Sequence, residues 1–352
     1  MMRTIGKICG AMLILALLGA LWWLFIDSAP PPRRPDLVRV PAELGPPPKG
    51  FPTENALLAA FGLSSIGLMD LDLVDMDASA PEVEGIAVRK DIVYGMGGDT
   101  ELQLDLYTPE GLIEPAPGLI FIHGGGWRSG KRQDYALYTS RFARHGYVVA
   151  TVSYRLREAG YFPNSVEDVK AAVRWMRANA AEINVDPDRI AAIGGSAGGH
   201  LAMMLGYTSD VPELEGSGGN PGVSSAVQAV VNIYGPVDFS VYPERDHRLV
   251  TTYLQGRYEE RTEIYELASP ILHVDPSDPP TLIIHGTLDT LVPVTQSDLL
   301  AEKFQELGMA YWYDRIDGWP HAMDVANPVN ARVEQVAVAF LREVFETAAP
   351  ER

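Results

Sequence analysis

A serine flanked by small residues is the first feature that could do chemistry. The pentapeptide Gly194–Gly198 has the pattern G-x-S-x-G around Ser196, between the apolar run Ile190–Ile193 and a helix-like segment that begins at Gly199. Glycine permits the strained strand-to-helix turn that this pattern forms, because side chains beside the serine would collide with neighbouring backbone. The turn lifts the serine oxygen out at the edge of a sheet, beside a helix N-terminus. We therefore predict Ser196 as a nucleophile, the alternative being a glycine turn with a bystander serine.

A glycine loop supplies donors for negative charge. His123, Gly124, Gly125, Gly126 and Trp127 follow the apolar run Gly118–Ile122. Acyl transfer places negative charge on a carbonyl oxygen, and backbone N–H groups in such a loop are preorganised donors for it. We predict Gly124, Gly125 and Gly126 as oxyanion donors, the alternative being a flexible turn. His123 lies upstream of Ser196 and is expected to fix the loop rather than act as the base.

A base and an acid follow the serine in the order that this chemistry uses. An imidazole titrates near neutral pH and can take the serine proton. His321 ends the turn 317–321 after the last predicted strand, and Asp289 lies in the loop after the penultimate one. We predict His321 as the general base and Asp289 as the carboxylate that orients it. Asp317 and Asp324 remain alternative acids, and His200 is expected to be a packed helix residue.

Alternating strands and helices must position these residues. Two runs flank the turn Gly95–Asp99, and six short apolar runs follow, as expected of buried parallel strands. The eight predicted strands are Val88–Tyr94, Leu102–Tyr107, Gly118–Ile122, Tyr147–Tyr154, Ile190–Ile193, Val227–Ile233, Thr281–Ile284 and Tyr311–Ile316. Helical patterns lie at Ser165–Ala181, Ser297–Leu307 and Val329–Phe345. The alternation predicts the α/β class, with a mostly parallel sheet of eight strands covered by helices on both faces.

The composition excludes several classes of protein. The 352 residues are 47% hydrophobic, which is ample for a sizeable core. The formal net charge of −18 makes nucleic acid an unlikely partner, since nothing is gained by counterion release. The one cysteine, Cys9, cannot form a disulfide within the chain. No motif of a metal or phosphate site is present, so we expect neither a metal nor a cofactor.

The N-terminus predicts export. Residues 8–26 carry no charge and are long enough to span a bilayer, with Trp22 and Trp23 towards their far end. A cleavable signal peptide is the competing interpretation. We favour an uncleaved anchor in residues 1–27, which would be the molecule's only membrane contact and would leave the main domain in the periplasm or outside the cell.

The remaining chain divides into a linker and one domain. Nine of the 27 prolines fall in residues 28–52, which predicts a stiff spacer. One α/β domain is expected over residues 53–352. Within it, residues 238–280 show no clear strand, and a connection that long predicts a small cap over the active site.

The combined motifs resemble a known family. The chain carries HGGGW, then SYRL at Ser153–Leu156, DPDRIAAIGGSAGGHLA at Asp186–Ala202, HGTLDTLVP at His285–Pro293, and GWPH before Ala322. Together they resemble the bacterial carboxylesterases of the α/β-hydrolase fold related to hormone-sensitive lipase, and within them the feruloyl-esterase-like group. The resemblance implies Ser196, Asp289 and His321 as a triad, and adds the N–H of Ala197 to the oxyanion donors.

The resemblance implies a serine carboxylic-ester hydrolase acting through an acyl-enzyme. Its expected partner is a small-molecule ester, with short-chain acyl, acylated-sugar or aryl esters as candidates. Two alternatives stay open at this point: an amide-directed hydrolase of the same fold, similar to arylformamidases or exopeptidases, and a non-catalytic binding protein on a hydrolase scaffold. The oligomeric state is left open.

Overall fold

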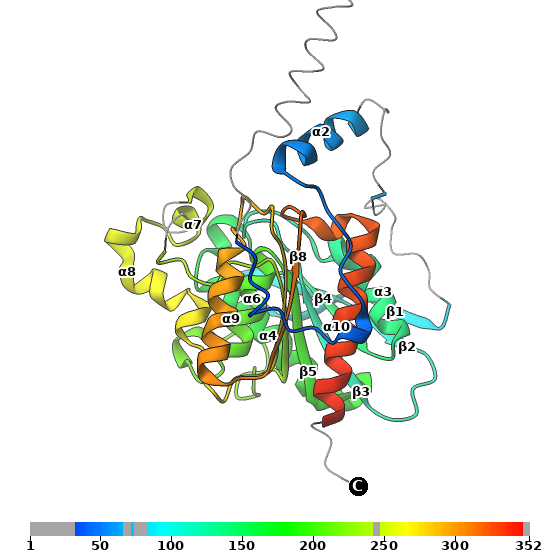
Figure 1. Cartoon of the computed structure of the whole chain (residues 1–352). Coiled ribbons are helices and arrows are strands. Elements are labelled where there is room, and N and C mark those ends of the chain that lie inside the picture. The colour runs from blue at the N-terminus through cyan, green and yellow to red at the C-terminus, as the bar shows by residue number, and fades with distance from the viewer. Residues whose placement is uncertain (1–31, 66–71, 74–83, 242–246, 348–352) are drawn as a thin grey trace, which may run out of the picture.

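The computed structural model describes residues 32–65, 72–73, 84–241 and 247–347 (Figure 1). The predicted anchor at residues 8–26 lies outside them. Within the described ranges, no helix combines the length and apolar character needed to cross a membrane.

One sheet of eight strands forms the centre of the domain. Its order is β1-β2-β4-β3-β5-β6-β7-β8. Strand β2 pairs antiparallel with both β1 and β4, and each later pair of neighbours in this order is parallel. The strands are β1 (Ile86–Gly97), β2 (Thr100–Pro109), β3 (Ala116–Ile122), β4 (Val148–Val152), β5 (Val185–Gly195), β6 (Ala229–Ile233), β7 (Thr281–Gly286) and β8 (Tyr311–Ile316). The predicted α/β-hydrolase fold with its mostly parallel sheet is confirmed.

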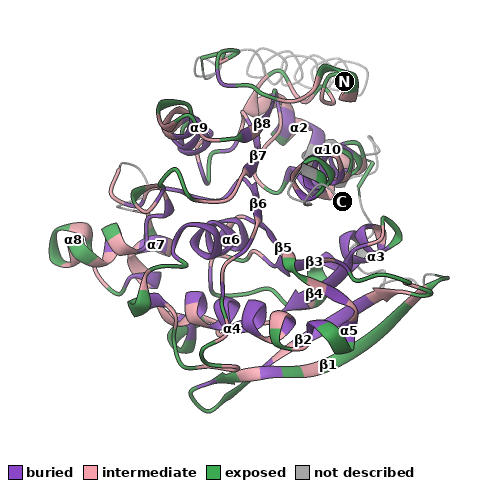
Figure 2. Cartoon of the chain, turned by 90° about the horizontal axis from the view of Figure 1, so that it is seen from below, coloured by how far each residue is buried: buried purple, intermediate pink, exposed green. Residues whose placement is uncertain are grey.

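Helices cover both faces of the sheet because its central strands are apolar on both sides. Leu119 and Phe121 of β3 enter one buried cluster, and Ile120 and Ile122 enter the other. Apart from the helices of residues 238–280, the longer ones are α2 (Glu54–Ser65), α3 (Ala136–Arg144), α4 (Asn164–Ala178), α6 (Ala197–Tyr207), α9 (Thr295–Leu307) and α10 (Asn327–Thr347). Figure 2 shows α4 and α6 on one side of the buried strands, and α3 and α10 on the other.

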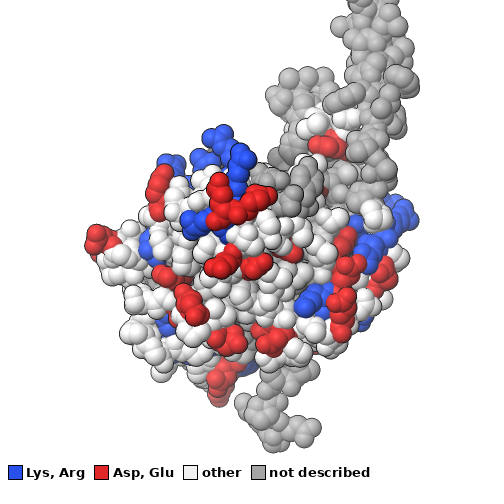
Figure 3. Space-filling model, turned by 90° about the vertical axis from the view of Figure 1, so that its left-hand side faces the viewer, with Lys and Arg blue, Asp and Glu red and all other residues white. Residues whose placement is uncertain are grey.

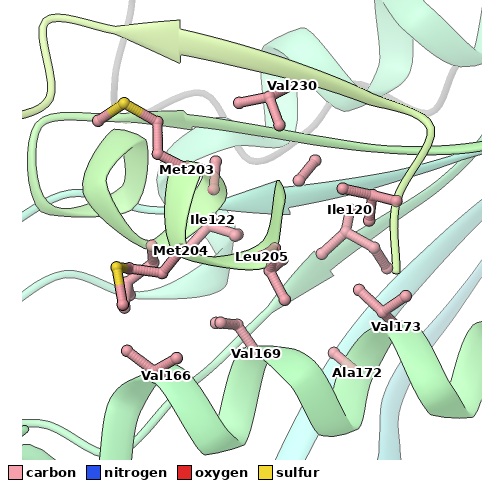
Figure 4. Close-up of a cluster of buried hydrophobic side chains, with 14 of the residues drawn as sticks. Ile120, Ile122, Val166, Val169, Ala172, Val173, Met203, Met204, Leu205 and Val230 are labelled. Atoms are coloured by element: carbon pink, nitrogen blue, oxygen red, sulfur yellow. The ribbon is translucent and has the colours of Figure 1, made fainter. Parts of the chain in front are cut away.

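The cluster between α4, α6 and the sheet fixes the helix that follows the candidate nucleophile. Val166, Val169 and Val173 of α4 lie near Met204 and Leu205 of α6 (Figure 4), and all five are fully buried. Burying an aliphatic side chain of this size contributes about 1.5–3 kcal/mol. Because α6 packs tightly against α4, the N-terminus of α6, where Ser196 lies, is held in place.

Several predicted boundaries shift, and two of these shifts change the local structure. The helix expected over Ser165–Ala181 is broken at Asn179 into α4 and the short α5 (Ala180–Ile183). The side-chain amide of Asn179 donates to the carbonyl of Trp175, a local bond that competes with helix continuation. The hairpin turn is also tighter than predicted, because Gly95–Gly97 belong to β1.

The expected cap segment, residues 238–280, contains two short helices and no strand within its described residues. These are α7 (Arg248–Tyr253) and α8 (Tyr258–Leu267), followed by the 3-10 turn η6 (Pro270–Leu272). Tyr253 stacks on Trp127 with ring centroids 4.3 Å apart, and the carbonyl of Ala268 lies 2.8 Å from His200 Nε2. The segment is thus held against the glycine loop of residues 123–127 and against α6.

Residues 32–52, which belong to the predicted stiff spacer, pack against the domain. Leu37 is fully buried in the core, and Arg39 forms an antiparallel bridge with Tyr313 of the edge strand β8. Tyr311 then accepts a 2.8 Å hydrogen bond from Arg39 Nε. Proline stiffness suits this arm, because an extended chain that is already rigid loses less entropy when it lies along an edge.

Candidate active site

Ser196 lies on a strained turn between β5 and α6. Its φ and ψ are 57° and −123°, and its N–H donates to the carbonyl of Ile233 at 2.9 Å. A Cβ on Gly194 would lie 2.3 Å from the backbone of Gly198, and one on Gly198 would lie 2.0 Å from the Ile122 carbonyl oxygen. The glycines of the motif are therefore required by backbone packing, as the sequence pattern predicts.

His321 faces the serine. Its Nε2 lies 2.8 Å from Ser196 Oγ, and its Nδ1 lies 2.6 Å from Asp289 Oδ2. Since a carboxylate can only accept, Nδ1 carries the proton, and Nε2 is left to accept from the serine hydroxyl. The next residue, Ala322, has a left-handed φ of 56°, so the turn that presents the imidazole is itself strained.

Asp289 is held ionised. Its side chain has no solvent exposure, and its Oδ1 accepts from the N–H groups of Leu291 and Val292 at 3.0 and 2.8 Å. Burial alone would raise the pKa of Asp289, but hydrogen bonds to His285 and His321 outweigh it and lower the pKa to about 2. A charged carboxylate at this place suits the stabilisation of a protonated His321.

His285 is a neighbour of Asp289 that the sequence analysis left without a role. This fully buried residue places Nε2 3.1 Å from Asp289 Oδ2 and 2.9 Å from the Val292 carbonyl oxygen. Its Nδ1 lies 2.7 Å from Ser297 Oγ. Two acceptors face Nε2, which therefore carries the proton. The spacing of four residues from His285 to Asp289 was the available signal, but only the fold shows that the loop turns back on the strand.

The other candidate acids and His123 have different partners. Asp317 is 71% exposed, and Asp324 accepts a hydrogen bond from the hydroxyl of Tyr234. His123 is buried, donates from Nδ1 to the Gly124 carbonyl at 2.8 Å and stacks on Tyr154 at 4.4 Å. The geometry thus brings together Ser196, Asp289 and His321. Asp317, Asp324 and His123 lie outside this hydrogen-bonded group.

The glycine loop lies beside the serine, with two of its glycines in conformations that side chains resist. Gly125 and Gly126 have φ values of 107° and 60°, and a Cβ on Gly124 would lie 2.9 Å from the Gly195 carbonyl oxygen. Within the described chain, the backbone N–H groups of Gly125, Gly126 and Ala197 donate to no carbonyl outside regular helices and strands. They are available to a ligand next to Ser196.

A cavity of about 680 Å³ opens above these groups. Its wall includes Gly124–Gly126, Ser196 and His321 together with the aromatic residues Tyr135, Tyr138 and Tyr234. A second, smaller hollow lined by Trp127, Ala197 and Leu249 meets it at Gly126 and Ser196. No cluster of three or more His, Cys, Asp or Glu side chains suited to a metal ion occurs among the described residues.

Comparison with known proteins settles the family. The BD-FAE family description matches residues 104–304, more than half of the chain. The chain belongs to the BD-FAE family. It is also 32% identical over 271 residues to "Esterase LipC" and 33% identical over 272 residues to "Esterase LipQ", both of Mycobacterium tuberculosis. These alignments span 74% of the chain, and 66% and 63% of the length of the two relatives.

Solved esterase structures have the same fold. A butyrate-bound thermophilic esterase, Est2 of Thermogutta terrifontis, is 30% identical, covers 77% of this chain and 98% of its own, and has a TM-score of 0.65. A truncated carbohydrate esterase from gut microbiota is 28% identical with a TM-score of 0.65, over 73% of this chain and 96% of its own. The predicted relationship to α/β-hydrolase carboxylesterases is confirmed by these similarities.

Proposed function

We propose that this BD-FAE protein hydrolyses carboxylic esters through an acyl-enzyme on Ser196. The observation that carries the proposal is the continuous line of contacts from Ser196 Oγ through His321 to Asp289, with distances of 2.8 and 2.6 Å. The esterases among its relatives and structural neighbours support the same reaction class. The chain spans 66% and 63% of the lengths of LipC and LipQ, so the activity is proposed here from the site of this chain itself.

The reaction proceeds in two halves. Ser196 Oγ attacks the ester carbonyl while His321 Nε2 takes the serine proton. The N–H groups of Gly125, Gly126 and Ala197 donate hydrogen bonds to the carbonyl oxygen as negative charge develops on it. His321 then protonates the departing alcohol. In the second half, His321 activates a water molecule that attacks the acyl-serine, and the acid leaves as Ser196 regains its proton.

The substrates that we propose are esters with short acyl chains, or acyl groups on sugars or aryl alcohols. The cavity volume suits groups of that size, since ligand sites are commonly about 300–1,000 Å³. Among the structural neighbours, one esterase is described as butyrate-bound and another as a carbohydrate esterase.

The test is hydrolysis of p-nitrophenyl acetate, butyrate and decanoate by the protein and by its Ser196→Ala variant. We expect turnover that is faster for the short esters and falls by about 10³-fold or more in the variant, because the nucleophile is lost. Equal rates in the two proteins would contradict the proposal and direct the search to formamides, peptides and ligand binding.

A further inference from the structure

Two arginines line the cavity above Ser196. Arg128 lies two residues beyond the oxyanion loop, and Arg157 follows β4. Both are exposed to solvent, and within the described chain neither guanidinium lies within 4.0 Å of a carboxylate. By contrast, the neighbouring Arg155 binds Asp168 at 2.7 Å and Arg132 binds Asp105 at 2.8 Å. The cavity therefore contains positive charge that no carboxylate of the described protein neutralises at close range.

The backbone holds Arg157 in this place against its own preference. Its φ is 55°, in the left-handed region that a long side chain rarely adopts. Its N–H donates to the Trp127 carbonyl at 2.9 Å, and its Nε donates to the Arg128 carbonyl at 3.1 Å. Since strained residues of this kind collect at functional sites, a ligand role is the natural explanation. Among the described residues, the Nη groups of Arg157 donate no hydrogen bond.

The two arginines lie at one end of the cavity. In the sheet, β4 and β3 lie on one side of β5, which carries Ser196, and β8 lies on the other. Arg128 and Arg157 follow β3 and β4, whereas His321 and Asp324 follow β8. Among the cavity-lining residues that follow β3 and β4, the acidic one is Asp134, whose carboxylate accepts the N–H of Lys131 at 3.0 Å. Two cations and one anion thus leave a net positive charge at this end.

This local charge opposes that of the whole molecule. The chain has a formal net charge of −18, which repels anions at long range. On the face shown in Figure 3, acidic side chains are scattered, and the basic ones lie in the upper part, beside acidic ones, and at the right-hand edge. A neutral ester has no negative charge to pair with the arginines at this end of the cavity. A carboxylate does, and guanidinium groups bind carboxylates with paired hydrogen bonds.

We propose that the cavity selects esters that carry a carboxylate, and that Arg128 and Arg157 bind that carboxylate while Ser196 attacks the ester carbonyl. This proposal rests on the esterase function proposed above and names its substrate class. The carboxylate can belong to the acid half or to the alcohol half of the ester, and the experiment separates the two.

The experiment uses the full chain in mild detergent and two matched pairs of esters. The first pair is p-nitrophenyl butyrate and the p-nitrophenyl monoester of succinate, and the second is 4-acetoxybenzamide and 4-acetoxybenzoate. The Ser196→Ala variant supplies the background rate for each. We expect kcat/KM to be about tenfold higher for the charged member of at least one pair, mainly through KM, because a charge-assisted contact adds to binding.

Variants assign the preference to the two arginines. In the double variant Arg128→Gln, Arg157→Gln, the charged-to-neutral ratio of kcat/KM should fall to about one, and lysine at both positions should restore part of it. The control is Arg144→Gln, which removes one positive charge at the far end of α3, outside the cavity lining. Raising the salt concentration from 0.05 to 0.5 M should lower the ratio in the unmodified protein and in Arg144→Gln, and leave it unchanged in the double glutamine variant.

Each failure has its own meaning. A ratio of one or less in both pairs, or an equal loss of preference in Arg144→Gln, overturns the carboxylate proposal while the esterase function stands. Absence of Ser196-dependent turnover for all four esters overturns the esterase function itself.

Discussion

At the scale of single residues, the ionised state of Asp289 decides how His321 works. Asp289→Asn should lower kcat by about 10³–10⁴-fold, because an amide can hold His321 in the wrong tautomer. Steady-state rates with p-nitrophenyl butyrate measure this loss. Asp317→Asn is the control, because Asp317 is an exposed acid in the loop that carries His321. A loss of similar size in Asp317→Asn would contradict the assignment.

The same carboxylate makes the fold sensitive to acid. The pKa of Asp289 falls from an ordinary 3.8 to about 2 in the folded state, so the unfolded chain binds its proton first. Its contribution to stability is therefore present above pH 3.8 and is lost as the pH falls through 2. Urea unfolding between pH 5 and 2 should show a smaller loss of stability in Asp289→Asn than in the parent protein; parallel curves would contradict this.

His285 is predicted to act through Asp289 as a positioning residue. His285→Phe removes the donor to the carboxylate and to the Val292 carbonyl, which should lower kcat about tenfold and cost about 1–3 kcal/mol of stability. His285→Gln retains a donor and should recover part of kcat. The pH profile of kcat separates positioning from mere destabilisation, since weaker hydrogen bonding to Asp289 should move its acid limb. An unmoved limb with a reduced melting temperature would indicate a structural role alone.

At the scale of elements, the N-terminal arm clamps the loop that carries His321. The N–H groups of Gly50 and Phe51 donate to the carbonyls of Asp317 and Gly318 at 3.2 and 2.7 Å, and Trp319 Nε1 donates to the Pro48 carbonyl at 3.0 Å. Phe51 and Trp319 also meet edge to face at 5.9 Å. These contacts lie directly before the catalytic turn.

Removing residues 1–52 should therefore reduce kcat by about tenfold and lower the melting temperature, whereas removing residues 1–31 should change neither. Each hydrogen bond contributes about 0.5–1.5 kcal/mol, and burial of Leu37 adds about 1.5–3 kcal/mol. Thermal unfolding and rates with a short neutral ester provide the measurement. Equal behaviour of the two truncated proteins would show that the arm has no part in positioning His321.

The cap is joined to α6 through a histidine that must stay neutral. His200 is fully buried among Trp127, Phe239 and Tyr253, its Nε2 donates to the Ala268 carbonyl, and its Nδ1 has no partner within the described chain. Burial lowers the pKa of His200 from 6.5 to about 4, although the bond to Ala268 opposes the shift.

Stability should consequently fall as the pH drops from 6.5 towards 4, because the unfolded chain takes up a proton that folded His200 refuses. The loss attributable to this residue is about 3 kcal/mol at most. His200→Gln keeps a donor for Ala268 and should flatten the dependence of unfolding free energy on pH in that window. If the variant and the parent lose equal stability between pH 7 and 4.5, another group is responsible.

At the scale of the whole molecule, we propose that the domain is exported and held at a membrane by residues 8–26. The support is their sequence alone, which is uncharged over a bilayer-spanning length. Fractionation of cells that produce the full chain should place it with membranes, with the domain accessible to protease from outside the cytoplasm. Recovery of a shortened protein in the soluble exported fraction would instead indicate signal cleavage, and protection inside the cytoplasm would contradict export.

The sequence predicted the sheet, and it singled out Ser196, Asp289 and His321, which the fold brings together, because both leave local signals. Buried parallel strands such as Ile190–Ile193 are short apolar runs, and Ser196 sits in a motif that few backbones satisfy. The contact of His285 with Asp289, the packing of Leu37 and the backbone strain at Arg157 depend instead on segments that meet only in the folded chain. Proline content alone likewise could not distinguish a free spacer from an arm along β8.

The most direct test of the account is covalent capture of the nucleophile. Paraoxon transfers a diethylphosphoryl group to an activated serine and releases p-nitrophenol, and one structural neighbour is described as phosphorylated by it. The account predicts one phosphoryl group per chain, located on Ser196 by peptide mass spectrometry, with activity lost in proportion to labelling. No labelling of an active protein, or inactivation with the label on another residue, would contradict the central claim that Ser196 carries the acyl group.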